Sequence, residues 1–165
     1  MPHGADDISF RCPIRDDGYN IYRLIADSPP LDVNSVYSYY VLSEHFRDTC
    51  VVAEYAGEQV GFLSAYRPPT HPDSLFVWQV AVDSAMRGRR IAWRMLQWLL
   101  ARGDSSSLRW VEATVNPSNA ASRGLFERLA RDRGTEVREE LFLDRAAFGP
   151  DGAHESEILL RVPLS

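Results

Sequence analysis

The stretch VAVDSAMRGRRIAWRML, residues 80–96, joins an apolar strand to an apolar helix through a short basic turn. The run 75–82 leading into it has one polar residue, Gln79, which predicts a central strand buried on both faces. From Ile91 onward, apolar residues recur at helical spacing. A helix that follows a strand directly leaves its first N–H groups unpaired, and the helix dipole makes them a site for an anion.

The basic turn itself has two interpretations. Gly88 would let the backbone approach an anion closely, and the neighbouring arginines would add charge-assisted hydrogen bonds. The same arginines, with Arg94, would also form the solvated face of an ordinary amphipathic helix. The Walker and dinucleotide-binding glycine patterns are both absent. The turn alone therefore leaves an anion site and a solvated helix as equal alternatives.

Strand and helix patterns alternate along the rest of the chain. Strands are predicted over 8–14, 49–55, 60–67, 75–82, 108–115, 135–143 and 155–164, and helices over 16–28, 36–46, 89–103 and 117–134. Ser35 and Ser118 are the predicted N-caps of the second and fourth helices, and Gly57 the turn of a hairpin. Tyr39, Leu42 and Phe46 are expected on one stripe of the second helix. The order predicts an α/β fold with a mixed sheet and helices on both faces.

Length and composition restrict the class of protein. A chain of 165 residues with 45% hydrophobic and 25% charged residues suits a single soluble domain, expected over 9–165 after a flexible N-terminus, 1–8. The net charge of -5 argues against a nucleic-acid binder, and no apolar run is long enough to span a membrane. A cytoplasmic location is the default expectation. Basic residues gather between Arg87 and Arg131, which favours a small anionic ligand.

Cysteine and histidine usage predicts neither a disulfide framework nor a metal site. Cys12 and Cys50 form no C-x-x-C pair and are expected to be reduced, mostly buried thiols. The four histidines show no metal-ligand spacing.

The succession of strand, basic turn, helix, strand, NPSN loop and helix resembles the GNAT superfamily of N-acetyltransferases. Its phosphate-loop pattern, [RQ]-x-x-G-x-[GA], maps onto residues 87–92, with Arg90 where glycine is usual. The segments DSPPLDVNSVYSYY, LFVWQVAVDS, EATVNPSNAASRGLFERLA and HESEILLRV resemble the superfamily members that acetylate L-2,4-diaminobutyrate in ectoine biosynthesis, a pathway of osmoprotection. The likeness extends over about residues 9–162.

This resemblance implies a GNAT-like single domain with a mostly antiparallel sheet of six to seven strands. It implies transfer of the acetyl group of acetyl-CoA, a co-substrate, to the 4-amino group of diaminobutyrate, without a metal. The partners implied are a small-molecule amine and, through edge strands, a second copy in a homodimer, with no nucleic acid or membrane. Two alternatives stay open: an N-acetyltransferase for another small amine, and a non-catalytic CoA-binding regulatory domain.

The resemblance also implies the residues that hold acetyl-CoA. Backbone amides of the phosphate loop would bind the pyrophosphate, and the end of the buried strand, Val80 to Val82, would pair with the pantetheine arm. The amide of Val80 is the expected oxyanion donor. Asn119 either contacts the cofactor or caps its helix. The phosphate-loop residues are Arg87, Gly88, Arg89, Arg90, Ile91 and Ala92.

Acceptor-binding residues are expected on four segments; they are Asp32, Tyr37, Trp78, Asn116 and His154. Asp32 would bind a substrate ammonium or else order its own loop, and Trp78 would line the acceptor pocket or pack in the core. Glu157 is the candidate base or ammonium partner.

Three further observations qualify this site. In a strand, residues three apart point to opposite faces, so His154 and Glu157 meet only if the chain bends. Glu112 is either a structural acid or a base acting through water. Phe126 occupies the position of a tyrosine that protonates the thiolate in many relatives, so this step has no assigned residue.

Overall fold

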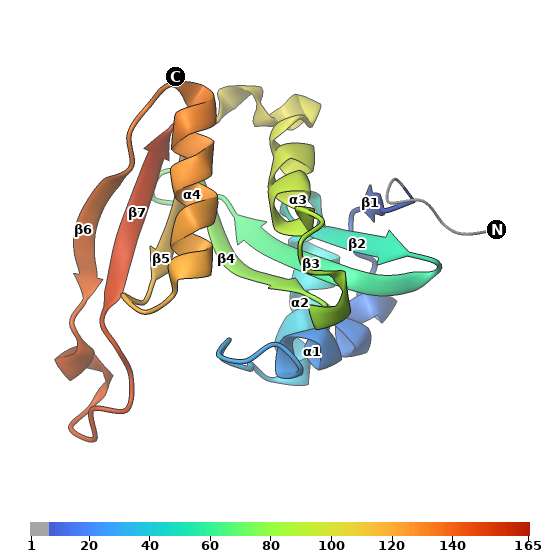
Figure 1. Cartoon of the computed structure of the whole chain (residues 1–165), viewed down its shortest axis with the longest axis horizontal. Helices are drawn as coiled ribbons and strands as arrows, with labels where there is room; N and C mark the ends of the chain where they lie inside the picture. The colour runs from blue at the N-terminus through green and yellow to red at the C-terminus, as the bar shows by residue number, and fades with distance from the viewer. Residues whose placement is uncertain (1–6) are drawn as a thin grey trace. The chain divides into compact units, whose positions relative to one another are not determined.

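The structure is a computed structural model that describes residues 7–165. Within them the predicted order of seven strands and four helices is confirmed (Figure 1). The strands are β1 (Ser9–Arg11), β2 (Val51–Tyr55), β3 (Glu58–Tyr66), β4 (Ser74–Val82), β5 (Trp110–Val115), β6 (Arg138–Leu143) and β7 (Glu157–Pro163). The helices are α1 (Gly18–Ala26), α2 (Val36–His45), α3 (Ile91–Leu100) and α4 (Ala120–Arg133). Of the N-terminal segment predicted to be flexible, residues 1–6 lie outside the described residues, and Ile8 is buried.

The strands are hydrogen-bonded in the order β1-β2-β3-β4-β5-β7-β6. The β4–β5 pair is parallel, whereas β1–β2, β2–β3, β5–β7 and β6–β7 are antiparallel, which confirms the mixed, mostly antiparallel sheet. The chain divides into two compact units: one takes the residues up to Tyr66 and Gln79–Ser106, and the other takes Arg67–Trp78 and Ser107–Ser165. No helix over residues 7–165 is long and apolar enough to cross a membrane.

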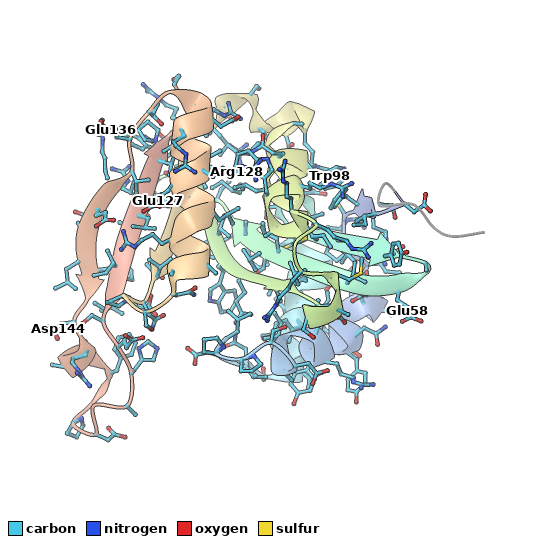
Figure 2. All side chains as sticks on the ribbon, viewed as in Figure 1. Glu58, Trp98, Glu127, Arg128, Glu136 and Asp144 are labelled. Carbon is cyan, nitrogen blue, oxygen red and sulfur yellow. The ribbon has the colours of Figure 1, made fainter. Side chains whose placement is uncertain are left out.

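In the first unit, helices cover both faces of β2 and β3 (Figure 1). Phe62 packs in a core cluster with residues of α1 and α2. Its neighbour Gly61 points to the opposite face, where an added Cβ would lie 3.0 Å from Ile91 and 3.2 Å from Met95 of α3. Glycine thus allows α3 to pack closely on the sheet. Trp98 of α3 (Figure 2) is only partly buried, and the guanidinium of Arg102 lies 5.0 Å from its ring centre.

Local turn and cap signals in the sequence are confirmed at two places. Ser35 caps α2, because its side chain accepts a hydrogen bond from the backbone N–H of Ser38. The β2–β3 hairpin turns at Ala56 and Gly57, whose φ values of 51° and 80° are left-handed. This is the turn type that matches the twist of a two-residue hairpin.

The predicted burial of one strand and the predicted extent of one helical stripe are wrong. β4 is not buried on both faces: Leu75, Val77, Gln79 and Ala81 are buried, but Trp78, on the alternate face, is 43% exposed. The buried face packs towards α1 and α2, since Ala81 belongs to their core cluster, and the other face is only partly covered. Phe46 is also exposed, because α2 ends at His45 and Phe46 leaves the helical stripe.

Candidate active site

The connection from β4 to α3 ends in a helix that no side chain caps. The chain passes through Gly88 at φ 82° and reaches Arg90, the N-cap of α3, at φ 59° and ψ 30°. Both residues are left-handed, a conformation that glycine adopts freely, which explains why glycine is usual at the position of Arg90. Arg90 makes no side-chain capping bond, so the first N–H groups of α3 keep their capacity to donate. An added Cβ on Gly88 would meet nothing within 4 Å, so the turn is open to a ligand.

The four arginines of this segment divide into two pairs. The guanidinium of Arg89 lies 5.3 Å from the ring centre of Tyr55, and that of Arg94 lies 5.2 Å from the ring centre of Phe10. Arg87 and Arg90 are exposed, and no side chain over residues 7–165 pairs with either. The structure thus distinguishes two arginines that stack on aromatic rings from two that are exposed without a side-chain partner over residues 7–165, and a guanidinium stacked on a ring keeps its N–H donors.

The backbone of β4 offers a donor close to this turn. The N–H of Gln79 donates to Ser64 Oγ of β3 at 3.1 Å. Successive N–H groups of a strand point to opposite edges, so the N–H of Val80 points away from β3. The parallel ladder with β5 ends at the pair Phe76↔Glu112, before Val80 and Val82. The amide of Val80 therefore lies on a stretch of β4 beyond that ladder.

Asn119 is the N-cap of α4, and the prediction of Ser118 in this role is wrong. Asn119 Oδ1 accepts a hydrogen bond from the N–H of Ser122 at 3.1 Å. Ser118 lies one residue too early, and its hydroxyl donates instead to Glu155 Oε2 at 2.5 Å. The carbonyl oxygen of the Asn119 side chain is occupied, which leaves its NH₂ group for other contacts.

Three of the predicted acceptor residues lie before α2, on α2 and on β4. Asp32 is exposed in the loop that precedes α2, and Tyr37, in the first turn of α2, is 76% exposed. Trp78 is exposed on β4, so its predicted alternative role in the core is wrong. The backbone carbonyl of Asp32 accepts a hydrogen bond from Gln79 Nε2 at 2.7 Å. Sequence reasoning noted Gln79 as a lone polar residue in a strand but did not find this contact.

His154 and Glu157 are brought together by a bend just before β7. His154 Nε2 lies 3.9 Å from Glu157 Oε1, and the His154 ring stacks on Phe148 with ring centres 3.8 Å apart. The sequence predicted that these two residues meet only if the chain bends, and the structure has this bend at His154. Asn116 follows β5, and its backbone carbonyl accepts a hydrogen bond from the N–H of Asn119 at 3.0 Å.

Glu112 is a structural acid. It is 3% exposed in β5, and its Oε1 accepts hydrogen bonds from Arg161 Nε at 2.7 Å and Ser74 Oγ at 3.1 Å. His71 Nε2 lies 3.2 Å from the other carboxylate oxygen. A buried carboxylate with these partners fastens β5 to its neighbours rather than facing a substrate.

The cysteines are free thiols, as expected. Cys50 is fully buried, and this burial raises its pKa to about 12, whereas Cys12 is only partly buried. Over residues 7–165, no group of three or more His, Cys, Asp or Glu side chains is arranged to hold a metal ion.

Comparison with known proteins shows the family. The model of the acetyltransferase (GNAT) family matches residues 18–130. L-2,4-diaminobutyric acid acetyltransferase of Bordetella parapertussis is 50% identical, over 98% of this chain and 87% of that protein. The Vibrio cholerae enzyme of the same name is 44% identical, over 94% of this chain and 89% of that protein.

A solved structure agrees with these relatives. Diaminobutyrate acetyltransferase EctA from Paenibacillus lautus, in complex with its substrate L-2,4-diaminobutyric acid and coenzyme A, is 41% identical to this chain. The two superpose with a TM-score of 0.90, and the match covers 94% of each chain. The chain therefore belongs to the acetyltransferase (GNAT) family, in which its near relatives are the L-2,4-diaminobutyric acid acetyltransferases.

Proposed function

We propose that this protein transfers the acetyl group of acetyl-CoA to the 4-amino group of L-2,4-diaminobutyrate, giving N4-acetyl-L-2,4-diaminobutyrate for ectoine biosynthesis. The observation that carries this proposal is the likeness, at 41% identity and a TM-score of 0.90, to an enzyme bound to diaminobutyrate and coenzyme A. Identity at this level over nearly the whole chain makes a shared substrate the simplest account.

In this proposal the N-terminus of α3 binds the pyrophosphate of acetyl-CoA. The donors are the backbone amides of the phosphate loop, residues 87–92, and the free guanidiniums of Arg87 and Arg90. The uncapped helix start and the open turn at Gly88 support it. The pantetheine arm would extend along β4 as far as Val80 and Val82. Asn119 would reach the cofactor through its NH₂ group, because its carbonyl caps α4.

The chemistry requires a neutral amine and a donor to the thioester oxygen. An alkyl ammonium has a pKa near 10, so only about one molecule in a thousand is nucleophilic at neutral pH. Glu157, beside His154, would accept the proton, and the amine nitrogen would attack the thioester carbon as the carbon–sulfur bond breaks. The Val80 N–H would stabilise the charge that develops on the carbonyl oxygen. Phe126 has no proton to give, so water or another residue would protonate the thiolate.

The acceptor residues would recognise the two ammonium groups and the carboxylate of diaminobutyrate. Asp32 supplies a carboxylate for an ammonium, and Tyr37, Asn116 and His154 supply polar groups for the rest of the substrate. Trp78, exposed on β4, supplies a ring face for a cation. The exposure of Asp32, Tyr37 and Trp78 supports a binding role over a structural one.

A homodimer would form through β6, which is an edge strand of the sheet. Its six residues are all exposed, and among them Leu141 and Phe142 are 59% and 56% exposed. The exposed apolar end of this edge strand, residues 141–143, could pair with another chain, whereas its first three residues are charged. We also propose a cytoplasmic location, where acetyl-CoA is available, and with it a part in osmoprotection.

Coenzyme A thiol release, followed with diaminobutyrate, ornithine, lysine and a peptide amine, tests the function. We expect turnover to be fastest with diaminobutyrate. Glu157→Gln should lower kcat by about 100-fold with a smaller change in KM, since removal of a general base costs this much. Binding of acetyl-CoA without turnover of any amine would favour the regulatory domain. Faster turnover of another amine would reassign the substrate.

A further inference from the structure

A buried polar network joins the middle of β4 to the loop that precedes α2. Gln79 is 5% exposed, and its Nε2 donates to the backbone carbonyl of Asp32 at 2.7 Å. Its Oε1 accepts a hydrogen bond from the hydroxyl of Tyr39 at 3.1 Å. The same hydroxyl oxygen accepts the backbone N–H of Asn34 at 3.2 Å. Tyr39 is fully buried, so water cannot replace its bonds.

The network holds the loop at two points. One bond ends on the backbone of Asp32 and the other on the backbone of Asn34, which fixes the position and direction of the segment between them. Both polar ends of the Gln79 amide are used, and a buried group with this geometry has one orientation only. The carbonyl of Asp32 is therefore held at a fixed distance from β4.

This connection has a consequence for catalysis that rests on the proposed function. Gln79 precedes Val80, whose amide we assign to the thioester oxygen, and Asp32 carries the carboxylate that we assign to a substrate ammonium. We propose that Gln79 and Tyr39 are positioning residues that set the distance between the acceptor loop and the acetyl-transfer point on β4. This distance would select the length of the diamine, because each methylene moves the reactive nitrogen by more than about 1 Å.

Two nearly isosteric variants test the proposal. Tyr39→Phe removes the hydroxyl, and Gln79→Met removes the amide but keeps the length of the side chain. For each, kcat/KM is measured with diaminobutyrate and with ornithine, which is one methylene longer. We expect kcat/KM for diaminobutyrate to fall by about tenfold or more, the loss that a misplaced reactant causes. The preference for diaminobutyrate over ornithine should shrink, and the KM for acetyl-CoA should stay within about twofold.

Ser43→Ala provides a matched control. Ser43 is fully buried in α2, and its hydroxyl donates to the backbone carbonyl of Tyr39 at 2.7 Å, so it touches the same residue but not the loop. This variant should lower the Tm and keep the diaminobutyrate-to-ornithine ratio of the unaltered protein. Tyr39→Phe is the milder of the two test variants and supplies the answer if Gln79→Met does not fold.

The outcomes separate the two proposals. An unaltered protein that prefers diaminobutyrate, with test variants that lose this preference, supports the positioning role. Test variants that lower the Tm as Ser43→Ala does, but keep the ratio, would overturn it and leave the network purely structural. An unaltered protein that acetylates neither diamine would instead refute the proposed function.

Discussion

The starts of α3 and α4 differ although each helix follows a strand of the sheet. α4 begins at Asn119, whose side chain satisfies the N–H of Ser122. α3 begins at Arg90, a left-handed residue whose side chain makes no capping bond. Two free guanidiniums, those of Arg87 and Arg90, accompany the uncapped start. From this comparison we propose that the start of α3 is an anion site, because it lacks a side-chain cap and carries positive charge, whereas the start of α4 is capped.

The uncapped start lowers the stability of the protein without its ligand. A missing cap costs a helix about 1 kcal/mol, and a left-handed residue other than glycine costs roughly another 1 kcal/mol. An anion bound at α3 would offset these costs by accepting hydrogen bonds from the free amides. The start of α4 does not need a bound anion, because the Asn119 side chain already accepts a hydrogen bond from the N–H of Ser122.

The largest expected effect comes from reversing the charge at α3. The double substitution Arg87→Glu and Arg90→Glu should raise the KM for acetyl-CoA by about 100-fold, since it replaces two charge-assisted contacts with repulsion. The kcat at saturating acetyl-CoA should change little. Initial rates over a range of acetyl-CoA concentrations measure both.

The matched control for this charge reversal is on α4. Arg131→Glu changes the charge of an exposed residue near the end of that helix, away from its capped start. It should leave the KM for acetyl-CoA within about twofold, because exposed charges at a distance are screened by salt. A double variant at α3 that behaves like this control would remove the basis for the contrast between the two helices.

A smaller effect is expected from removing the cap of α4. Asn119→Ala should lower the free energy of unfolding by about 1 kcal/mol, and Asn119→Ser, which keeps a capping oxygen, should recover most of the loss. Urea unfolding of the two variants measures this difference. If both variants also raise the KM for acetyl-CoA by the same factor, the NH₂ group of Asn119 binds the cofactor and α4 contributes to the anion site as well.

The smallest effect is expected from giving α3 its usual glycine. Arg90→Gly removes the strain of a left-handed arginine but adds flexibility to the unfolded chain, so the net gain in unfolding free energy should be about 0.5 kcal/mol. The KM for acetyl-CoA should rise about threefold, because one guanidinium is lost and the amide remains. A loss of more than about 1 kcal/mol in thermal or urea unfolding would show that the Arg90 side chain has a structural role.

The sequence predicted the local features well because local signals decide them. The cap at Ser35 and the hairpin at Gly57 depend on a few neighbouring residues, and both are confirmed. The choice between Ser118 and Asn119 failed, since two adjacent capping residues differ only in which one precedes the first helical turn. The predicted burial of β4 on both faces was also wrong, because an apolar run does not show whether a helix covers each face of the strand, and Trp78 is exposed.

Contacts between distant residues could not be predicted from either segment alone. Gln79 and Asp32 are 47 residues apart, and Gln79 and Tyr39 are 40 apart, so only the folded chain brings their side chains and backbone together. From the sequence, contact between His154 and Glu157 could be predicted only if the chain bends, because residues three apart in a regular strand point to opposite faces. The roles of these residues in binding and catalysis stay predictions.

The response of backbone amides to coenzyme A tests most directly whether the start of α3 binds the pyrophosphate. In an NMR titration of ¹⁵N-labelled protein, the amides of Gly88 to Ala92 should shift with saturating behaviour. Pantetheine, which lacks the pyrophosphate, should leave them nearly unchanged. We predict that the largest shifts lie at the start of α3. Large shifts at Asn119 to Ser122, with unchanged amides at residues 88–92, would contradict it.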